Sequence, residues 1–197
     1  MKLVVVAPLF LEALAVRSTL PAVKVRRSGM GRHELDFGDA DAVAIAGLCG
    51  GVDPSLRAGD VVLATELRSE DGLALPCPGS ALLAEPLRRL GLRAVSGALY
   101  TSSRILGRDE RLRLRATGVL AVDMESAWLV QAAGERSVAV LRVVVDTADR
   151  RLLSLRTLAA GIRGLSRLRR AAPAFVDWVE ACVSAAADAD TLTPEVA

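Results

Sequence analysis

Aromatic residues, paired cysteines and histidines are all scarce in this chain of 197 residues. Aromatic side chains make up 3% of the sequence, so the core has to be built from Leu, Val and Ala, and few rings are left to stack on a base. The three cysteines, Cys49, Cys77 and Cys182, form no C-x-x-C element, which argues against a disulfide framework and against zinc. His33 is the only histidine, and this excludes a histidine-rich metal site. We therefore expect no metal centre.

An excess of one charge and a long apolar run are missing as well. The 25 basic and 23 acidic residues nearly cancel to a net charge of +2, and no basic stretch is interleaved with aromatics, which argues against nucleic-acid binding. The apolar residues 1–16 are interrupted by Pro8 and Glu12 and lack a clean signal-peptide cleavage site. No stretch reaches the roughly 20 apolar residues that cross a bilayer. These features predict a soluble cytoplasmic protein.

Short β-branched segments alternate with helical patterns along the chain. Continuous apolar strands of this kind are buried on both faces, as in α/β sheets that helices cover. Strands are predicted at residues 2–6, 23–27, 42–46, 60–64, 94–99, 121–122 and 139–145, the third ending in a glycine-rich turn at residues 47–51. Helices are predicted at residues 80–90, 124–133, 155–170 and 173–187. The sequence thus predicts one α/β domain over residues 1–187, with a flexible tail at residues 188–197.

Two acidic motifs follow apolar strands. Glu125, within V-D-M-E-S-A, lies where a strand runs into a helix, and a carboxylate there suits the neighbouring hydroxyls of a sugar. The alternative is that Asp123 or Glu125 only caps the helix. Asp146 ends the most apolar strand, where apolar surroundings raise the pKa of a carboxyl group and make it a proton donor near neutral pH. Its alternative is an ordinary turn residue.

Two weaker motifs lie earlier in the chain. Glu12 follows the first strand and either activates a nucleophile or occupies the first turn of a surface helix. The segment S-G-M-G-R, which contains Ser28, Gly29 and Arg32, follows the second strand. Its glycines let backbone N–H groups converge on an oxyanion, although most such segments are plain turns.

The order of these motifs is more specific than any one of them. The succession of Glu12, S-G-M-G, G-L-C-G-G, D-M-E-S and R-V-V-V-D-T-A-D resembles the purine and uridine phosphorylase family over residues 1–149. Within that family, A-G-L-C-G-G-V-D, A-V-D-M-E-S-A-W and L-R-V-V-V-D-T-A-D-R are similar to the hopanoid-biosynthesis-associated phosphorylases and to methylthioadenosine/S-adenosylhomocysteine nucleosidases. The resemblance implies a three-layer fold, with a central mixed sheet flanked by helices, and an enzyme that cleaves purine nucleosides.

The resemblance also implies roles for residues of the later motifs. Asp146 would protonate or hydrogen-bond the purine N7, and Arg142 would support the site. Glu125 would bind the ribose 2′- and 3′-hydroxyls, with Met124 packed against the sugar. Glu12 matches the carboxylate that activates water in nucleosidases. A carboxylate near the ribose would stabilise an oxocarbenium-like transition state.

The glycine-containing segments are implied to lie near the nucleophile. Gly47 would line the substrate site, while Ser28, Gly29 and Arg32 would bind inorganic phosphate, the expected co-substrate. No cofactor is implied. Two departures weaken this phosphate site: Ile45 replaces an arginine and Leu48 replaces a serine found in family members. A third departure is the short segment at residues 31–41, which predicts that the helix following the S-G-x-G turn in the family is truncated or lost.

These residues are compatible with several functions. The leading prediction is phosphorolytic cleavage of an adenine nucleoside, with adenosylhopane as the specific substrate. The retained Glu12 favours the alternative of a hydrolytic methylthioadenosine/S-adenosylhomocysteine nucleosidase. The short segment at residues 31–41 supports a third reading, a non-catalytic nucleoside-binding protein. The resemblance further implies a homo-oligomer.

The helix predicted at residues 155–170 combines an apolar face with a basic one. The apolar face holds Leu155, Leu158, Ile162 and Leu165, and the basic cluster holds Arg156, Arg163, Arg167 and Arg170. A basic amphipathic helix can rest on anionic lipid, which predicts a peripheral membrane contact. The alternative is an ordinary helix that packs on the sheet and turns its basic face to solvent.

Overall fold

The computed structural model describes residues 1–147 and 155–191. Its strands are β1 (Leu3–Ala7), β2 (Lys24–Arg27), β3 (Ala42–Gly51), β4 (Val61–Ser69), β5 (Ala74–Pro76), β6 (Ala94–Thr101), β7 (Val119–Asp123) and β8 (Ser137–Thr147). Its helices are α1 (Phe10–Arg17), the 3-10 helix η1 (Pro78–Leu83), α2 (Ala84–Arg89), α3 (Arg108–Arg115), α4 (Ser126–Ala133), α5 (Leu155–Ala171) and α6 (Ala174–Thr191). No helix in the described ranges is long and apolar enough to span a bilayer.

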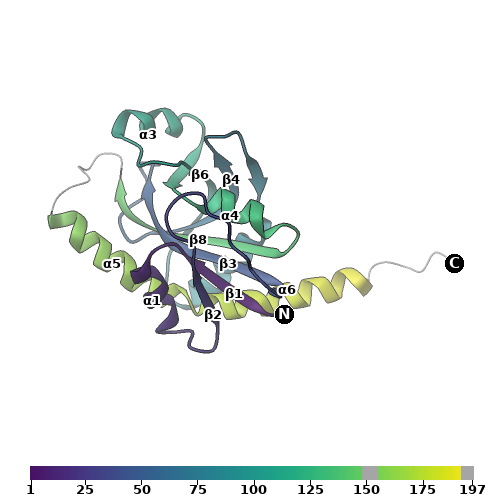
Figure 1. The fold of residues 1–197 in the computed structure, drawn as a ribbon. Helices are drawn as coiled ribbons and strands as arrows, with labels where there is room; N and C mark the ends of the chain where they lie inside the picture. The colour runs from purple at the N-terminus through teal and green to yellow at the C-terminus, as the bar shows by residue number, and fades with distance from the viewer. Residues whose placement is uncertain (148–154, 192–197) are drawn as a thin grey trace.

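The eight strands form one mixed sheet that partly closes on itself (Figure 1). Strands β2, β1, β3 and β8 are parallel neighbours, and so are β4, β6 and β7. Antiparallel pairing joins β8 to β4, and it joins the end of β3 to β7. The five strands β3, β8, β4, β6 and β7 therefore form a closed ring, which holds the ends of β3, β7 and β8 close together.

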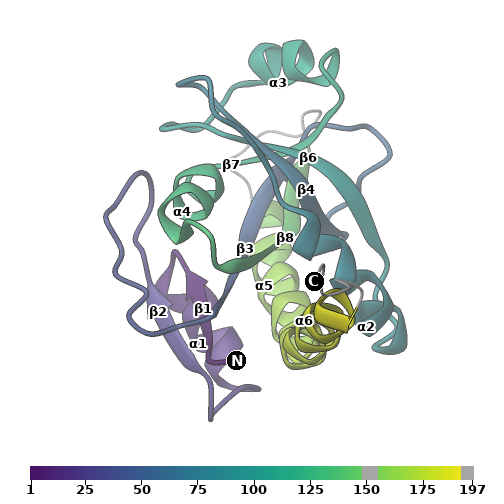
Figure 2. The same ribbon diagram turned by 90° about the vertical axis from the view of Figure 1, so that its right-hand side faces the viewer.

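Helices cover both faces of the sheet because its inner strands are apolar on both sides. Val5 and Ala44 pack in the layer shared with α1, α5 and α6, whereas Val4 and Val43 pack in the layer shared with α4. Figure 2 shows α5 and α6 on one side of β3 and β8 and α4 on the other. Strands buried on both faces have to be apolar throughout. The structure confirms the predicted α/β fold with a central mixed sheet flanked by helices.

Most predicted elements are present, with shifted ends. Strands β4, β6, β7 and β8 are longer than predicted, and the helix predicted at residues 80–90 divides into η1 and α2. Neither β5 nor α3 was predicted. Helix α6 continues to Thr191, so residues 188–191 of the predicted tail are helical. Residues 192–197, and Ala148 and Asp149 of the last motif, lie outside the described residues.

The glycine-rich segment at residues 47–51 is strand, and the prediction of a turn there was wrong. Strand β3 continues through it in parallel register with β8. A Cβ atom at Gly47 would lie 2.2 Å from Nη1 of Arg142. A Cβ atom at Gly50 would lie 2.7 Å from Nη2 of Arg111. Glycine is therefore needed here to let two arginine side chains approach the strand, rather than to reverse the chain.

Helix α5 packs through a face other than the predicted one. Ile162 is 63% exposed, whereas Leu168 and Ala171 are fully buried against the sheet. A Cβ atom at Gly164 would lie 2.7 Å from Cγ1 of Val145, so the small residues of α5 let it approach β8 closely. The side chains of Leu155, Arg156 and Leu158 lie outside the described residues. The predicted lipid contact stays a prediction.

The buried face of α5 can be tested by paired truncations. Leu168→Ala should lower the free energy of unfolding by about 3 kcal/mol, because it opens a cavity under a fully buried side chain. Ile162→Ala on the same helix should change it by less than about 0.5 kcal/mol, since its side chain is exposed. Urea unfolding of both variants measures the difference, and equal losses would show that the helix packs differently.

Candidate active site

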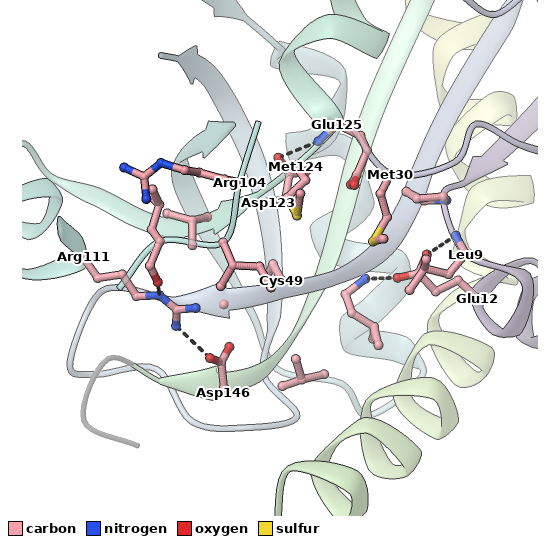
Figure 3. Close-up of a pocket in the computed structure, with 17 residues that line it drawn as sticks. Leu9, Glu12, Met30, Cys49, Arg104, Arg111, Asp123, Met124, Glu125 and Asp146 are labelled. Carbon is pink, nitrogen blue, oxygen red and sulfur yellow. Dashed lines mark hydrogen bonds and ion pairs between the residues drawn. The ribbon is translucent and has the colours of Figure 1, made fainter. Parts of the chain in front are cut away.

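A cavity of about 290 Å³ lies where β3, β7 and β8 end (Figure 3). It is lined by Pro8, Leu9, Glu12, Met30, Leu48, Cys49, Gly50, Arg104, Ile105, Leu106, Arg111, Val122, Asp123, Met124, Glu125, Val145 and Asp146. The walls are mostly aliphatic, and within the described ranges no aromatic ring lines them. Four carboxylates, Glu12, Asp123, Glu125 and Asp146, thus meet at one cavity from three separate segments of the chain.

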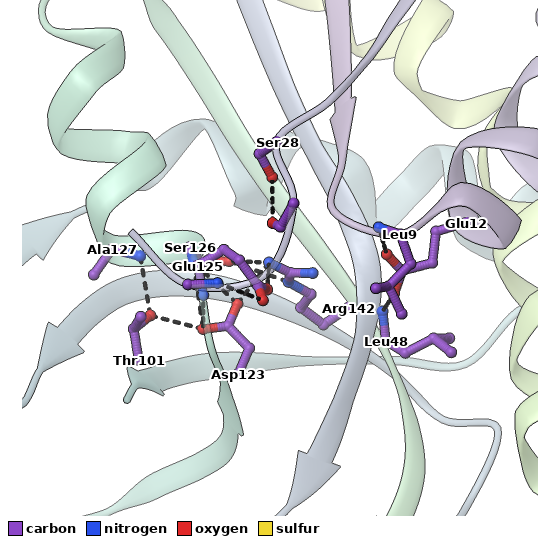
Figure 4. Close-up of polar contacts among 12 residues, drawn as sticks. Leu9, Glu12, Ser28, Leu48, Thr101, Asp123, Glu125, Ser126, Ala127 and Arg142 are labelled. Atoms are coloured by element: carbon purple, nitrogen blue, oxygen red, sulfur yellow. Dashed lines mark hydrogen bonds and ion pairs between the residues drawn. The ribbon is translucent and has the colours of Figure 1, made fainter. Parts of the chain in front are cut away.

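Arg142 is the centre of a buried ion network beside this cavity. Its side chain projects from β8 and is 0% exposed. Its Nη2 lies 2.7 Å from Oδ2 of Asp123 and 3.3 Å from Oε2 of Glu125. Its Nε and Nη2 both donate to Oγ of Ser126 (Figure 4). A buried guanidinium is tolerated only with such partners, because its desolvation costs several kcal/mol.

Asp123 and Glu125 have different tasks at the start of α4. Asp123 accepts hydrogen bonds from the backbone N–H groups of Glu125 and Ser126, and so satisfies donors that the first helical turn leaves free. Thr101 Oγ1 donates to the same carboxylate at 2.7 Å. Glu125 is then left to face the cavity. Of the two alternatives weighed for this motif, capping thus applies to Asp123.

The pKa of Glu125 reflects this setting. Burial raises it to about 7, the neighbouring charge of Arg142 opposes the rise, and the carboxylates of Asp123 and Glu12 add to it. Glu125 therefore changes charge close to neutral pH, and its capacity to accept two hydrogen bonds from a diol depends on pH in that range.

Glu12 is held rigidly at the other end of the cavity. It lies in the first turn of α1 and is 2% exposed. Its Oε2 accepts a hydrogen bond from the Leu9 N–H, and its Oε1 accepts one from the Leu48 N–H, both at 2.8 Å. The two alternatives weighed for Glu12 are therefore compatible, since the residue lies in a first helical turn and also faces the cavity.

Asp146 lies at the end of β8 and pairs with an arginine that sequence analysis missed. Oδ2 of Asp146 is 2.9 Å from Nη1 of Arg111, and both side chains are buried. Burial raises the pKa of Asp146, while the charge of Arg111 and its hydrogen bond oppose the rise. Helix α3, which carries Arg111, has acidic Asp109 and Glu110 in its first turn and arginines in its last. Acidic residues in the first turn and basic residues in the last turn favour a helix, and this pattern is the sequence signal that could have predicted α3.

Ser28, Gly29 and Arg32, which were expected to bind phosphate, do not line the cavity, although the Gly31 N–H between them donates to Oε1 of Glu125 at 3.4 Å. Arg32 is exposed and pairs with Asp71 at 3.0 Å, and Ser28 Oγ donates to the carbonyl oxygen of Gly29. Residues 28–41 form no helix. This agrees with the prediction from the short segment at residues 31–41 that a helix is truncated or lost there. Met30 lines the cavity and is 59% exposed, so the cavity meets solvent on this side.

Gly47 also has a place other than the one predicted. It does not line the cavity but lies beneath Arg142 and Glu12. A Cβ atom there would come 2.2 Å from Nη1 of Arg142 and 3.1 Å from Oε1 of Glu12. Met124, the other residue expected to contact substrate, does line the cavity.

A methyl group at Gly47 should therefore disrupt the site. Gly47→Ala should lower the free energy of unfolding by about 2 kcal/mol, since Arg142 is locked by its partners and cannot yield. The matched control is Gly161→Ala on α5, where nothing lies within 4 Å of the added carbon. It should leave stability unchanged or raise it by up to about 1 kcal/mol. Urea unfolding compares the two, and a neutral Gly47→Ala would contradict the close approach.

Comparisons with known proteins agree with this geometry. The family model described as "Phosphorylase superfamily" matches residues 25–176. The 5′-methylthioadenosine/S-adenosylhomocysteine nucleosidase of Glaesserella parasuis is 26% identical over 159 aligned positions, and the match covers 65% of this chain and 69% of the relative. The corresponding nucleosidase structure from Campylobacter jejuni superposes with a TM-score of 0.78 at 16% identity, covering 91% of this chain and 99% of that one.

Another solved structure is similar in fold. The native futalosine hydrolase of Helicobacter pylori superposes with a TM-score of 0.78 at 16% identity, covering 90% of this chain and 97% of that one. The family match extends over most of the chain, and it includes the strands and helices that carry Glu125, Arg142 and Asp146. The chain therefore belongs to the phosphorylase superfamily, as its motifs predicted, and is an enzyme of that superfamily.

Proposed function

We propose that this enzyme hydrolyses the N-glycosidic bond of a purine nucleoside. The observation that carries the proposal is the convergence of Glu12, Glu125 and Asp146 on one cavity. Asp146 would protonate the leaving base, Glu125 would hold the ribose hydroxyls, and Glu12 would accept a proton from the attacking water. Carboxylates on both sides of the sugar also stabilise the positive charge that develops as the bond breaks.

The surroundings of Glu12 support water as the nucleophile. Glu12 lines the cavity as a buried carboxylate, and its oxygens can accept further hydrogen bonds beyond those from the Leu9 and Leu48 N–H groups. A water molecule in the cavity can donate to such a carboxylate and pass a proton to it. Phosphate is disfavoured, because a dianion would meet the Glu12 carboxylate while Arg32 pairs with Asp71 at the surface.

The relatives support a choice of first substrates. The sequence relative from Glaesserella parasuis is named for 5′-methylthioadenosine and S-adenosylhomocysteine, so these two nucleosides come first. Futalosine is the next substrate to test, because the fold is similar to that of the Helicobacter pylori futalosine hydrolase. Adenosylhopane, which the sequence motifs imply, stays a prediction, and so does a phosphorolytic reaction.

Base release from these nucleosides tests the proposal. We expect release of the purine base in phosphate-free buffer, which is adenine for 5′-methylthioadenosine and S-adenosylhomocysteine, and we expect it to be unchanged on addition of phosphate. Asp146→Asn and Glu12→Gln should each lower kcat by about 10²- to 10⁴-fold, the range for loss of a general acid or base. Circular dichroism of the variants controls for folding, and Arg32→Gln, at a surface ion pair, should keep activity near that of the wild type.

Two results would contradict hydrolysis. Release that requires phosphate and falls in Arg32→Gln would make the enzyme a phosphorylase. Tight nucleoside binding without release from any nucleoside of the panel, unaffected by Asp146→Asn, would make the chain a nucleoside-binding protein. Chromatographic separation of the free 5′-substituted sugar from its 1-phosphate distinguishes the first of these from hydrolysis.

The pKa of Glu125 predicts a pH dependence of binding. The carboxylate accepts hydrogen bonds from the ribose and gains a proton as the pH falls through about 7. In the Asp146→Asn background, where the second acid is removed, the dissociation constant of 5′-methylthioadenosine should rise about tenfold between pH 8 and pH 6. Isothermal titration calorimetry measures it. Glu125→Gln should bind weakly at both pH values, and a dependence that persists in this variant would exclude Glu125 as its source.

A further inference from the structure

Arg111 is a charged residue of the cavity that the proposed reaction leaves without a role. It projects from α3, and its side chain is 6% exposed. Its guanidinium lies against the backbone of Gly50, where a Cβ atom would come within 2.8 Å of Cζ and Nη1. Helix α3 is otherwise highly charged and exposed, so Arg111 is the residue through which it carries a positive charge into the cavity wall.

Two hydrogen bonds fix the orientation of this guanidinium. Nη1 donates to Oδ2 of Asp146 at 2.9 Å, and Nε donates to the carbonyl oxygen of Leu106 at 3.2 Å. Figure 3 shows Arg111 and Asp146 together at the end of the cavity opposite Glu12. Because Oδ2 is occupied, Oδ1 of Asp146 is the oxygen left for a ligand.

The electrostatic surroundings of Asp146 are simple. From α3 it meets Arg111, and from β3 it faces the Cys49 thiol, whose pKa burial raises so that it stays neutral. The other charged groups on the elements around it make no contact with it in the described part of the chain, namely Glu12, Arg104, Asp123, Glu125, Arg163 and Arg167. Burial is therefore the main influence on the pKa of Asp146, and Arg111 is the main charged group that opposes it.

We infer that Arg111 is a positioning residue for the acid of this reaction, holding Asp146 with Oδ1 toward the base and stabilising the carboxylate that proton transfer leaves behind. The inference rests on the proposed function. In the step, the C1′–N9 bond breaks and its electron pair moves into the purine. The proton of Asp146 passes to N7, and water adds to C1′ while its own proton passes to Glu12. The new carboxylate of Asp146 remains paired with Arg111.

This arrangement makes Asp146 a stronger acid than burial alone would. Burial raises its pKa, and Arg111 acts against that rise by favouring the ionised form. Without the guanidinium, the pKa should rise further, so the carboxyl group should hold its proton to higher pH. A weaker acid also transfers its proton to the base less readily.

The test compares Arg111→Gln, which removes the charge, with Arg111→Lys, which keeps it. Carbon-13 NMR of the carboxyl groups in the ligand-free protein follows the titration of Asp146, with Asp146→Asn identifying its signal. We expect Arg111→Gln to move that titration upward by about one to three pH units and Arg111→Lys to move it much less. Arg113→Gln, which removes an exposed charge from the same helix, should leave it in place.

Kinetics with 5′-methylthioadenosine supply the second readout. In Arg111→Gln the decline of kcat toward high pH should move upward with the titration of Asp146, and the maximal kcat should fall about tenfold or more. A purely structural role would lower kcat without moving the pH at which it declines, and that result would overturn the inference. An unchanged Asp146 titration in folded Arg111→Gln, checked by circular dichroism, would overturn it as well. A shifted titration in a protein that cleaves no nucleoside would refute the proposed function while supporting control of Asp146 by Arg111.

Discussion

The burial of one guanidinium determines much of the site. Arg142 lies inside a closed ring of strands, where an uncompensated charge would cost several kcal/mol. Its compensation by Asp123 and Glu125 ties the end of β7 to β8 and fixes where α4 begins. The absence of a side chain at Gly47 gives the guanidinium its space. The same contacts that make the charge tolerable therefore direct Glu125 into the cavity.

A second arginine divides the cavity into two electrostatic ends. Arg111 accompanies Asp146 at one end, while Arg142 accompanies Glu125 beside Glu12 at the other. Arg111 lines the cavity beside Asp146, whereas Arg142 is not part of the lining and contacts Glu125 from β8. The cavity between them has mostly aliphatic walls, which lower the local dielectric and strengthen the charge interactions inside it. Such a setting favours a reaction whose transition state is a cation held between anions.

The sequence and its family resemblance pointed to the carboxylates and to Arg142, but not to the arginine that pairs with Asp146. Each of the three carboxylates, Glu12, Glu125 and Asp146, lies at or after the end of an apolar strand. Apolar runs are the clearest sequence signal of a sheet that helices cover on both faces. Arg111 was missed because its role depends on a contact across 35 residues, and a helix rich in arginine appears solvent-exposed from its sequence.

Errors at the glycine segments have a related cause. The sequence of residues 47–51 has the composition of a turn, and only the arginines that approach the strand explain why it stays extended. Arg32 follows two glycines in the sequence, and this suggested that it binds an anion. In the structure, its side chain pairs with Asp71 at the surface instead. Side-chain direction in an irregular segment depends on tertiary contacts that a single sequence does not reveal.

The closed ring of strands also bears on how the chain folds during synthesis. Glu12, Asp123 and Glu125 leave the ribosome before Arg142, and β8 is the last strand of the ring. Until β8 enters between β3 and β4, the carboxylates have no buried cation to meet, and they remain hydrated. Domains with such distant pairings pay the entropy of closing long loops before the contacts form. An N-terminal fragment that lacks β8 therefore lacks both Arg142 and Asp146, on which the two ends of the cavity depend.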